Sequence, residues 1–282
     1  MLDDHTVLTT DQLTRAFFTR PRTCLLRLEA LRGLGLLHRF RFAQPRGGTE
    51  PWKWVLDLVG AQVQAAATGR RMPTQRAHEQ HLYRLTFNPA LDHLLATNEF
   101  FVRLLHAARI PAASPAGGAP RASEQQRLDR WWPEQVATAR FPGIRPDGHG
   151  LWTSHVRTIG LFLETDLGSE NLARLLSKLD GYERLARSGG PVYPVLFWLH
   201  SPERETNLQK LLRAAEPEVP VATAVHTDDP AGAVWLPADG WHRVRLHELP
   251  SDHGIDHAAN PNWRDGHLDL GDQPHTRRAP AH

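Results

Sequence analysis

The chain has 282 residues, a single cysteine and a formal net charge of +2. One cysteine cannot form an internal disulfide, and no apolar stretch approaches the ~20 residues that a membrane-spanning helix requires. The length favours two domains. The amino terminus lacks the basic and apolar runs of a signal peptide, which predicts a cytoplasmic protein with no membrane partner.

The charge is distributed unevenly along the chain. Residues 1–87 carry thirteen Lys and Arg against seven Asp and Glu, which gives +6, whereas the remainder carries twenty against twenty-four, which gives −4. A basic module joined to an acidic one predicts that the front half meets a polyanion and that the back half holds carboxylates for another purpose. A chance imbalance of surface charge is the alternative.

The first residues predict a helix, a turn, a second helix and a hairpin. Capping residues at 9–12 precede a short helix that ends near residue 20, and Pro21 suits the start of a second helix over 21–32. That second helix would place Leu25, Leu28 and Leu31 on one face. Two strand-like runs follow at 36–42 and 52–56, and a small helix at 59–67. This order is typical of a winged helix-turn-helix, which we assign to residues 1–68.

The second helix of this module has the chemistry of a DNA recognition helix. Guanidinium groups and backbone N–H groups at its start are the donors that a helix in the major groove presents to bases and phosphates. The candidate contacts to double-stranded DNA are Arg20, Arg22, Thr23 and Arg27, with Arg46 in the wing. Two alternatives stay open, since these arginines also suit an ordinary solvated face, and winged helices also bind proteins.

The middle of the chain predicts a boundary. Residues 69–87 are polar and basic without a sustained period, which indicates a linker or a strand pair between domains. The second domain would begin near Asn88 with a long amphipathic helix over 89–109.

The back half alternates strands and helices. Strands are expected at 159–166, 192–199 and 219–225, with helices beginning at Ser169 and spanning 202–215, the latter capped by Ser201. The predicted fold class is therefore α/β (α+β), with a mixed sheet in a domain spanning 88–250. Residues 251–282 have few apolar anchors and are predicted to be a disordered tail. His253 and His257 have the spacing of a helical metal pair, but Gly254 and Pro261 disfavour that helix.

Three carboxylates are expected to converge in the back domain. Asp147 and Glu164 each lie near the end of a predicted strand, and Asp166 shares the pleat face of Glu164. Mg²⁺ or Mn²⁺ takes oxygen ligands, so two carboxylates and a phosphate can hold one such ion, which can activate water and neutralise developing charge. The alternative is an ordinary turn at Asp147 and a solvated strand end at Glu164.

Several motifs together resemble the replication-relaxation family of plasmid and actinobacterial mobile-element proteins. They are LTTDQLTRAFF with LEALRGLGLL, the Asn98–Glu99 helix, WPE at 132–134, RPDG at 145–148, LFLETD at 161–166, KLDGY at 178–182 and PVLFWLHSPER at 194–204. The resemblance implies a PD-(D/E)XK nuclease-like back half, with Asp147 and Glu164 as metal ligands.

One position departs from that pattern. The lysine of the motif, two residues after Glu164, is Asp166 here. Loss of such an electrostatic partner typically costs about a hundredfold to a thousandfold in rate. Lys178 could replace the lysine from the adjoining helix, and the alternative is that Lys178 is a solvated surface residue. Glu99 and Glu134 are weaker candidates.

Two functions from different classes follow. The first is a DNA-binding protein of plasmid replication or DNA relaxation that nicks or cleaves DNA as a metal-dependent endonuclease. The second is a non-catalytic DNA-binding accessory protein or transcriptional regulator with a degenerate nuclease-like domain. A homodimer, or a replication or mobilisation protein as partner, stays open.

Overall fold

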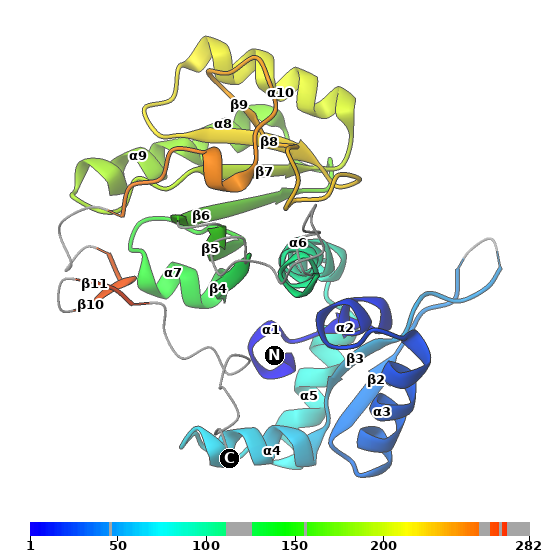
Figure 1. The fold of residues 1–282 in the computed structure, drawn as a ribbon. Helices are drawn as coiled ribbons and strands as arrows, with labels where there is room; N and C mark the ends of the chain where they lie inside the picture. Colours follow the sequence, from blue (N-terminus) through cyan, green and yellow to red (C-terminus); the bar gives the residue numbers. More distant parts are fainter. Residues whose placement is uncertain (45–46, 111–125, 155–156, 254–259, 265–266, 270–282) are drawn as a thin grey trace, which may run out of the picture. The chain divides into compact units, whose positions relative to one another are not determined.

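The computed structural model describes residues 1–44, 47–110, 126–154, 157–253, 260–264 and 267–269. The chain divides into two compact units, residues 1–102 and 103–282, and each is described by itself (Figure 1). A small antiparallel sheet and a six-stranded mixed sheet occur together with helices. The predicted α/β (α+β) class is therefore confirmed.

The first unit combines a three-stranded sheet with helices. The antiparallel strand order is β1-β3-β2. Its elements are α1 (Leu2–His5), β1 (Leu8–Thr9), α2 (Thr10–Phe17), α3 (Pro21–Gly33), β2 (Leu37–Phe40), β3 (Lys53–Leu56), α4 (Leu58–Ala67), α5 (Gln75–Thr86) and the start of α6 (Leu91–Arg109). The helices and strands expected at the front of the chain are all present.

Local capping fixes the ends of α2 and α3. The side chain of Thr9 accepts a hydrogen bond from the Gln12 backbone N–H, and the Gln12 side chain accepts one from the Thr9 N–H. This reciprocal pair satisfies two donors that a helix start leaves unpaired. Pro21 occupies the first turn of α3, where its missing N–H costs nothing.

The buried face of α3 differs from the predicted one. Cys24 and Leu28, one turn apart, are buried, whereas Leu25 is 40% exposed. The predicted stripe of Leu25, Leu28 and Leu31 was therefore wrong at its first position. The reason is that a small thiol packs as well as an aliphatic side chain, so Cys24 could take the core position.

Residues predicted as a linker or strand pair form a helix instead. Within 69–87 lies α5, whose start is capped by the Thr74 hydroxyl accepting from the Ala77 N–H. Leu85 and His78 are buried and Leu82 is partly buried in the core of the first unit. A stripe this narrow, set among polar and basic residues, left no clear period in the sequence. The two units divide further along the chain than the predicted boundary near Asn88.

The second unit is built on a six-stranded sheet in the order β4-β5-β6-β7-β8-β9. Strands β4 to β6 are antiparallel, β6 to β8 are parallel, and β9 is antiparallel to β8. The elements are β4 (Arg127–Pro133), α7 (Glu134–Arg140), β5 (Gly148–Ser154), β6 (Arg157–Asp166), α8 (Leu172–Ser177), α9 (Leu179–Arg187), β7 (Val195–Leu199), α10 (Pro202–Ala215), β8 (Val221–Val225), β9 (Leu236–Pro237), η2 (Leu246–Glu248), β10 (Trp263–Arg264) and β11 (His267–Leu268).

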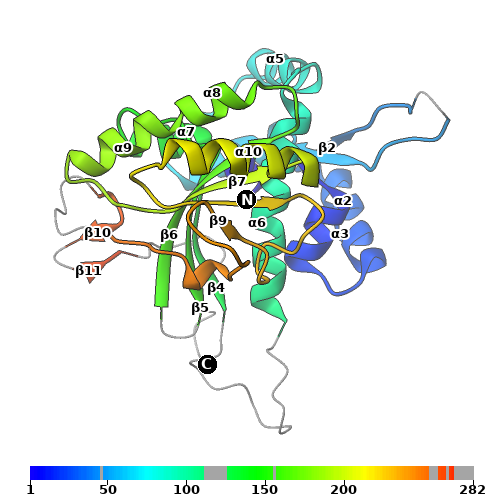
Figure 2. The same ribbon diagram turned by 90° about the horizontal axis from the view of Figure 1, so that it is seen from above.

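The crossover helices of this unit cover one side of the sheet. Figure 2 shows α8, α9 and α10 along the same side. Leu175, Leu179 and Leu208 from these helices pack there against Phe162 and Phe197 of the central strands. The predicted Ser201 cap of α10 is confirmed, since its hydroxyl accepts from the Arg204 N–H at 3.3 Å.

Part of the predicted disordered tail is folded. Asp252 forms a bridge with Val192, and β10 pairs with β11. Asn262 is fully buried, and its side-chain amide donates to Nε2 of His149 and to the Tyr193 hydroxyl. Buried polar groups need hydrogen-bond partners, and the tail supplies them here. The prediction for residues 251–269 was therefore wrong where the structure describes them, and residues 270–282 lie outside the described part.

Of the predicted histidine pair, His257 lies outside the described residues. Nε2 of His253 forms a hydrogen bond with the Thr158 carbonyl at 3.0 Å, and its Nδ1 forms one with the Tyr193 hydroxyl at 2.9 Å.

Among the helices that the structure describes, none has the length and apolar character to cross a membrane.

Candidate active site

The register of β5 and β6 sets Asp147 opposite Glu164. Gly148 pairs with Leu163, and the Asp147 N–H donates to the Leu163 carbonyl at 2.9 Å. The carboxylate of Asp147 also accepts from the Thr165 N–H at 2.7 Å. The acid of RPDG is thus anchored to the backbone that carries the acid of LFLETD.

Glu164 is a buried carboxylate with two side-chain donors. It is 1% exposed, its Oε2 accepts from Nζ of Lys178 at 2.8 Å, and its Oε1 accepts from the Tyr182 hydroxyl at 2.5 Å. Lys178 lies at the junction of α8 and α9, and Tyr182 lies one turn later on α9. The packing of these helices against the sheet therefore brings both donors to the strand.

Burial disfavours ionisation of the Glu164 carboxyl group. Desolvation, and after it the negative charge of Asp147, raise the pKa of Glu164 to about 7, against the opposing effects of Lys178 and Tyr182. Burial and the neighbouring Glu164 also raise the pKa of the Tyr182 hydroxyl well above its usual range. A carboxyl that titrates near neutrality beside a second carboxylate is typical of functional sites.

Lys178 stays charged in this setting. Burial alone would lower its pKa, but the carboxylates of Glu164, Asp147 and Glu170 outweigh burial and raise it. Its Nζ is 3.5 Å from the Glu170 carboxylate as well as 2.8 Å from Glu164. A fixed positive charge therefore lies directly beside the acid pair.

Asp166 has a different partner from the other two acids. It is buried, and Nε and Nη2 of Arg204 both donate to its carboxylate, while Nδ1 of His200 lies 3.7 Å away. Among the described residues, no group of three or more His, Cys, Asp and Glu side chains could hold a metal ion. The expectation that three carboxylates converge was therefore wrong. The reason is that Asp166 is paired with the guanidinium of Arg204 and does not join Asp147 and Glu164.

Asp147 and Glu164 remain as the pair that could hold Mg²⁺ or Mn²⁺. These ions prefer oxygen ligands and keep several waters, so a partly exposed Asp147 beside a buried Glu164 fits such an ion. The pKa of Glu164, which burial and then the charge of Asp147 raise, fits as well, since a cation would favour the ionised carboxylate. Lys178 already supplies part of the positive charge that offsets the two carboxylates.

The weaker acidic candidates lie in other surroundings. Glu99 pairs with Arg15 within the first unit. Glu134, at the start of α7, pairs with Arg145 at 2.6 Å, and both side chains of this pair are largely exposed. Neither acid has the buried setting of Glu164.

The predicted DNA contacts lie on the exposed side of α3. Arg20, Arg22, Thr23 and Arg27 are all exposed. Arg46 lies outside the described residues. The structure therefore places Arg22, Thr23 and Arg27 on α3 and Arg20 directly before its first residue, all of them accessible.

Sequence reasoning missed two arginines on the hairpin. The guanidinium carbons of Arg39 and Arg41 lie 4.0 Å and 4.1 Å from the ring centroid of Trp52. Arg39 also pairs with Glu29 of α3, whereas Arg41 is exposed. The alternation of arginine along residues 39–41 was the available signal, since strand residues two apart share a face.

The fold and site together define an α/β protein with a basic helical unit and a second unit that carries a buried acid–lysine cluster. The chain belongs to the replication-relaxation family, whose model matches residues 1–194. The match includes Asp147, Glu164, Lys178 and Tyr182, and it ends before α10. Neither curated proteins nor solved structures gave a significant match.

Proposed function

We propose that this chain binds double-stranded DNA and cuts one or both strands with Mg²⁺ or Mn²⁺ in plasmid replication or DNA relaxation. The family description points to that process. The carrying observation is the cluster of Asp147, Glu164 and Lys178, in which two acids and a cation meet on adjacent backbone segments.

The first unit supplies the DNA-binding half of the proposal. The order α2, α3, β2, β3 supports a winged helix-turn-helix, with α3 as the helix that enters the major groove. Its exposed Arg22 and Arg27 would contact phosphates or base edges, and Arg41 on the hairpin would contact the backbone. Binding would then weaken steeply as salt rises, because phosphate contacts release counterions.

The second unit supplies the chemistry, as a PD-(D/E)XK nuclease-like domain. Asp147 and Glu164 would hold the ion, which when bound would polarise the scissile phosphate and lower the pKa of a water. Tyr182 fixes the orientation of Glu164 through its hydroxyl, and Lys178 holds a positive charge where the phosphate would gain negative charge. Lys178 thus takes the role of the motif lysine that Asp166 replaces.

The test is nicking of supercoiled plasmid by the full chain with added Mn²⁺. We expect nicked circles from the wild type and none from an Asp147→Ala/Glu164→Ala double variant. Glu134→Gln is the matched control, because it removes an exposed carboxylate of the same unit outside the cluster. No nicked product from the wild type, or equal nicking by the double variant, would remove the enzymatic function.

A non-catalytic DNA-binding accessory protein or regulator is the second candidate. The observation that favours it is Asp166, which occupies the motif lysine position and is bound by Arg204. On this alternative, Lys178 neutralises Glu164 as a structural ion pair. Salt-sensitive DNA binding without nicking would identify it.

A further inference from the structure

A groove of about 680 Å³ opens at the amino ends of β7 and β8 in the second unit. Glu164 and Asp166 lie toward the carboxyl end of β6, where Asp166 pairs with Leu199 at the end of β7. The groove is therefore at the opposite end of the parallel strands from the acid–lysine cluster. It is also formed almost wholly by residues beyond 194, the last residue of the family match.

The wall of this groove is mainly apolar. It is lined by four separate segments of chain, and its prolines and valines include Val192, Pro217, Val219, Pro220, Pro237 and Pro250. Prolines have no N–H to satisfy, so this wall offers apolar surface with few backbone donors. Its volume is in the range of roughly 300–1,000 Å³ that is usual for ligand pockets.

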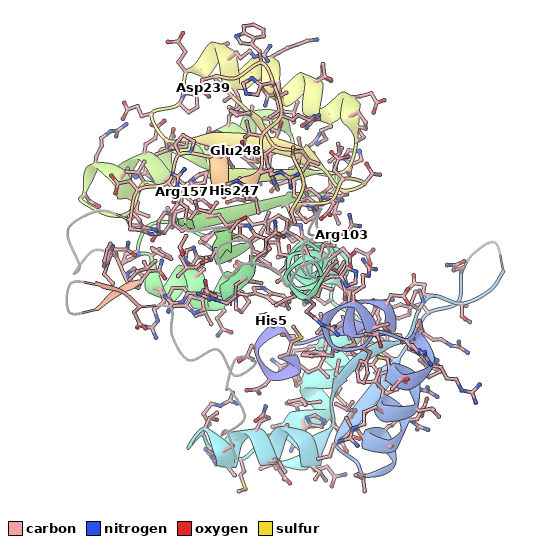
Figure 3. The ribbon with its side chains drawn as sticks, in the orientation of Figure 1. His5, Arg103, Arg157, Asp239, His247 and Glu248 are labelled. Carbon is pink, nitrogen blue, oxygen red and sulfur yellow. The ribbon has the colours of Figure 1, made fainter. Side chains whose placement is uncertain are left out.

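The rim of the groove is acidic and aromatic. The indole of Trp241 is 83% exposed. Glu216 and Asp239 are exposed, and neither carboxylate has a hydrogen-bond or ion partner among the described residues. Figure 3 labels Asp239 beside α10, the helix that ends just before Glu216. An exposed tryptophan that lines the same groove as two unpartnered carboxylates attracts a cation through its ring quadrupole and through their charge.

Arg213, which lines the groove, is already engaged. The guanidinium carbon of Arg213 lies 4.5 Å from the Trp241 ring, and Nη2 donates to the Gly240 carbonyl at 3.4 Å. Glu218, the third acid of the lining, pairs with Arg187 at 2.8 Å. Arg213 thus contacts the indole and keeps its positive charge, so Glu216 and Asp239 together leave the rim with a net charge of −1.

We propose that this groove binds an extended peptide segment of a partner protein in which an arginine or lysine stands between apolar residues. The cationic side chain would lie against Trp241 between Glu216 and Asp239, and its apolar neighbours would cover the proline and valine wall. The groove is partly open to solvent, so the peptide backbone would keep water as a hydrogen-bond partner. Aromatic anchors of this kind commonly dominate the energy of peptide recognition.

The test is fluorescence anisotropy of the full chain with a panel of labelled peptides. Each peptide carries a central Arg, Lys, Glu or norleucine between leucine, valine and proline. We expect Arg or Lys peptides to bind, and Glu and norleucine peptides to bind at least about tenfold more weakly, which is about 1.4 kcal/mol. Binding should also weaken as salt rises.

Two variants and one control locate the binding. Trp241→Ala and the Glu216→Gln/Asp239→Asn double variant should each lower the affinity for the cationic peptides about tenfold or more. Asp180→Asn removes an exposed acid of α9 outside the groove and should leave the affinity unchanged. Thermal unfolding should be nearly the same for all, because each substituted side chain is exposed.

Three results would overturn the proposal. They are no binding by any cationic peptide of the panel, equal binding of Glu peptides, and unchanged binding by both groove variants. A fourth concerns the ligand: if free agmatine bound as tightly as the peptides and displaced them, the ligand would be a small organic cation. None of these outcomes depends on nicking, so the nuclease proposal and this one fail separately.

Discussion

Nζ of Lys178 lies 2.8 Å from Oε2 of Glu164, and it arrives from a helix junction rather than from the strand that carries Glu164. Asp166, two residues further along that strand, pairs instead with Arg204 of α10. Two acids separated by one residue therefore have separate cations from separate helices. This division makes their contributions to activity and stability separable by mutation.

Substitution of Lys178 by methionine keeps the length of the side chain and removes the charge. If the proposed nuclease function holds, we expect the nicking rate to fall about a hundredfold to a thousandfold, because a preorganised charge is lost beside the reacting phosphate. The measurement is the initial rate of plasmid nicking with Mn²⁺. Lys210→Met, an exposed lysine of α10, is the matched control and should nick at the wild-type rate. Equal rates for both variants would contradict a role for Lys178.

Substitution of Asp166 by asparagine should affect stability rather than cutting. Asp166 is 2% exposed, and the Arg204 side chain would keep its charge with one carboxylate fewer. Breaking a buried ion pair typically costs about 3–5 kcal/mol of stability. We expect a loss near the lower value, because Arg204 keeps its hydrogen bond to the Glu170 carbonyl. Urea unfolding measures this loss. A nicking rate as low as that of Glu164→Gln would instead place Asp166 in the chemistry.

Removal of charge from α3 should weaken DNA binding in a salt-dependent way. For Arg22→Ala/Arg27→Ala we expect a lower affinity at low salt and a slope of log affinity against log salt that is shallower by about 2. Arg71→Ala/Arg76→Ala removes two other exposed arginines of the first unit and serves as the control. A protein-binding role for this unit predicts the same, salt-insensitive DNA affinity in all three proteins.

His149 should make the fold sensitive to acid. Burial, more than any other effect, lowers the pKa of His149 from 6.5 to about 3. Its Nδ1 hydrogen-bonds the Leu161 carbonyl, and its Nε2 accepts from the Asn262 amide. A second proton on the ring would therefore lie on Nε2 and point at the N–H of Asn262, which is itself a donor. Arg130 donates to the Asn262 side-chain oxygen and holds the amide in that orientation.

The sign of this effect follows from proton binding. The unfolded chain binds a proton at this histidine below about pH 6.5, whereas the folded chain does so only near pH 3, so stability is lost as pH falls through that window. The slope is up to about 1.4 kcal/mol per pH unit from this one group. Urea unfolding at several pH values should show a shallower slope for His149→Gln. Parallel curves would show that His149 is not the group responsible.

The sequence by itself determined local elements in each of the two units. Short-range signals, such as the reciprocal cap of Thr9 and Gln12 and the Ser201 cap of α10, act over three residues and are legible without tertiary structure. Strand alternation likewise placed Glu164 and Asp166 on one face. The α/β class followed from the order of such elements.

Only the tertiary structure decided which charges meet. Glu164 and Lys178 are fourteen residues apart, Asp166 and Arg204 thirty-eight, and Asn262 and His149 one hundred and thirteen. The stripe of α5 and the core position of Cys24 likewise depend on what packs against them. The physical reason is that an ion pair or a buried hydrogen bond is selected by burial and by the alternatives nearby, and neither quantity is a property of a short segment.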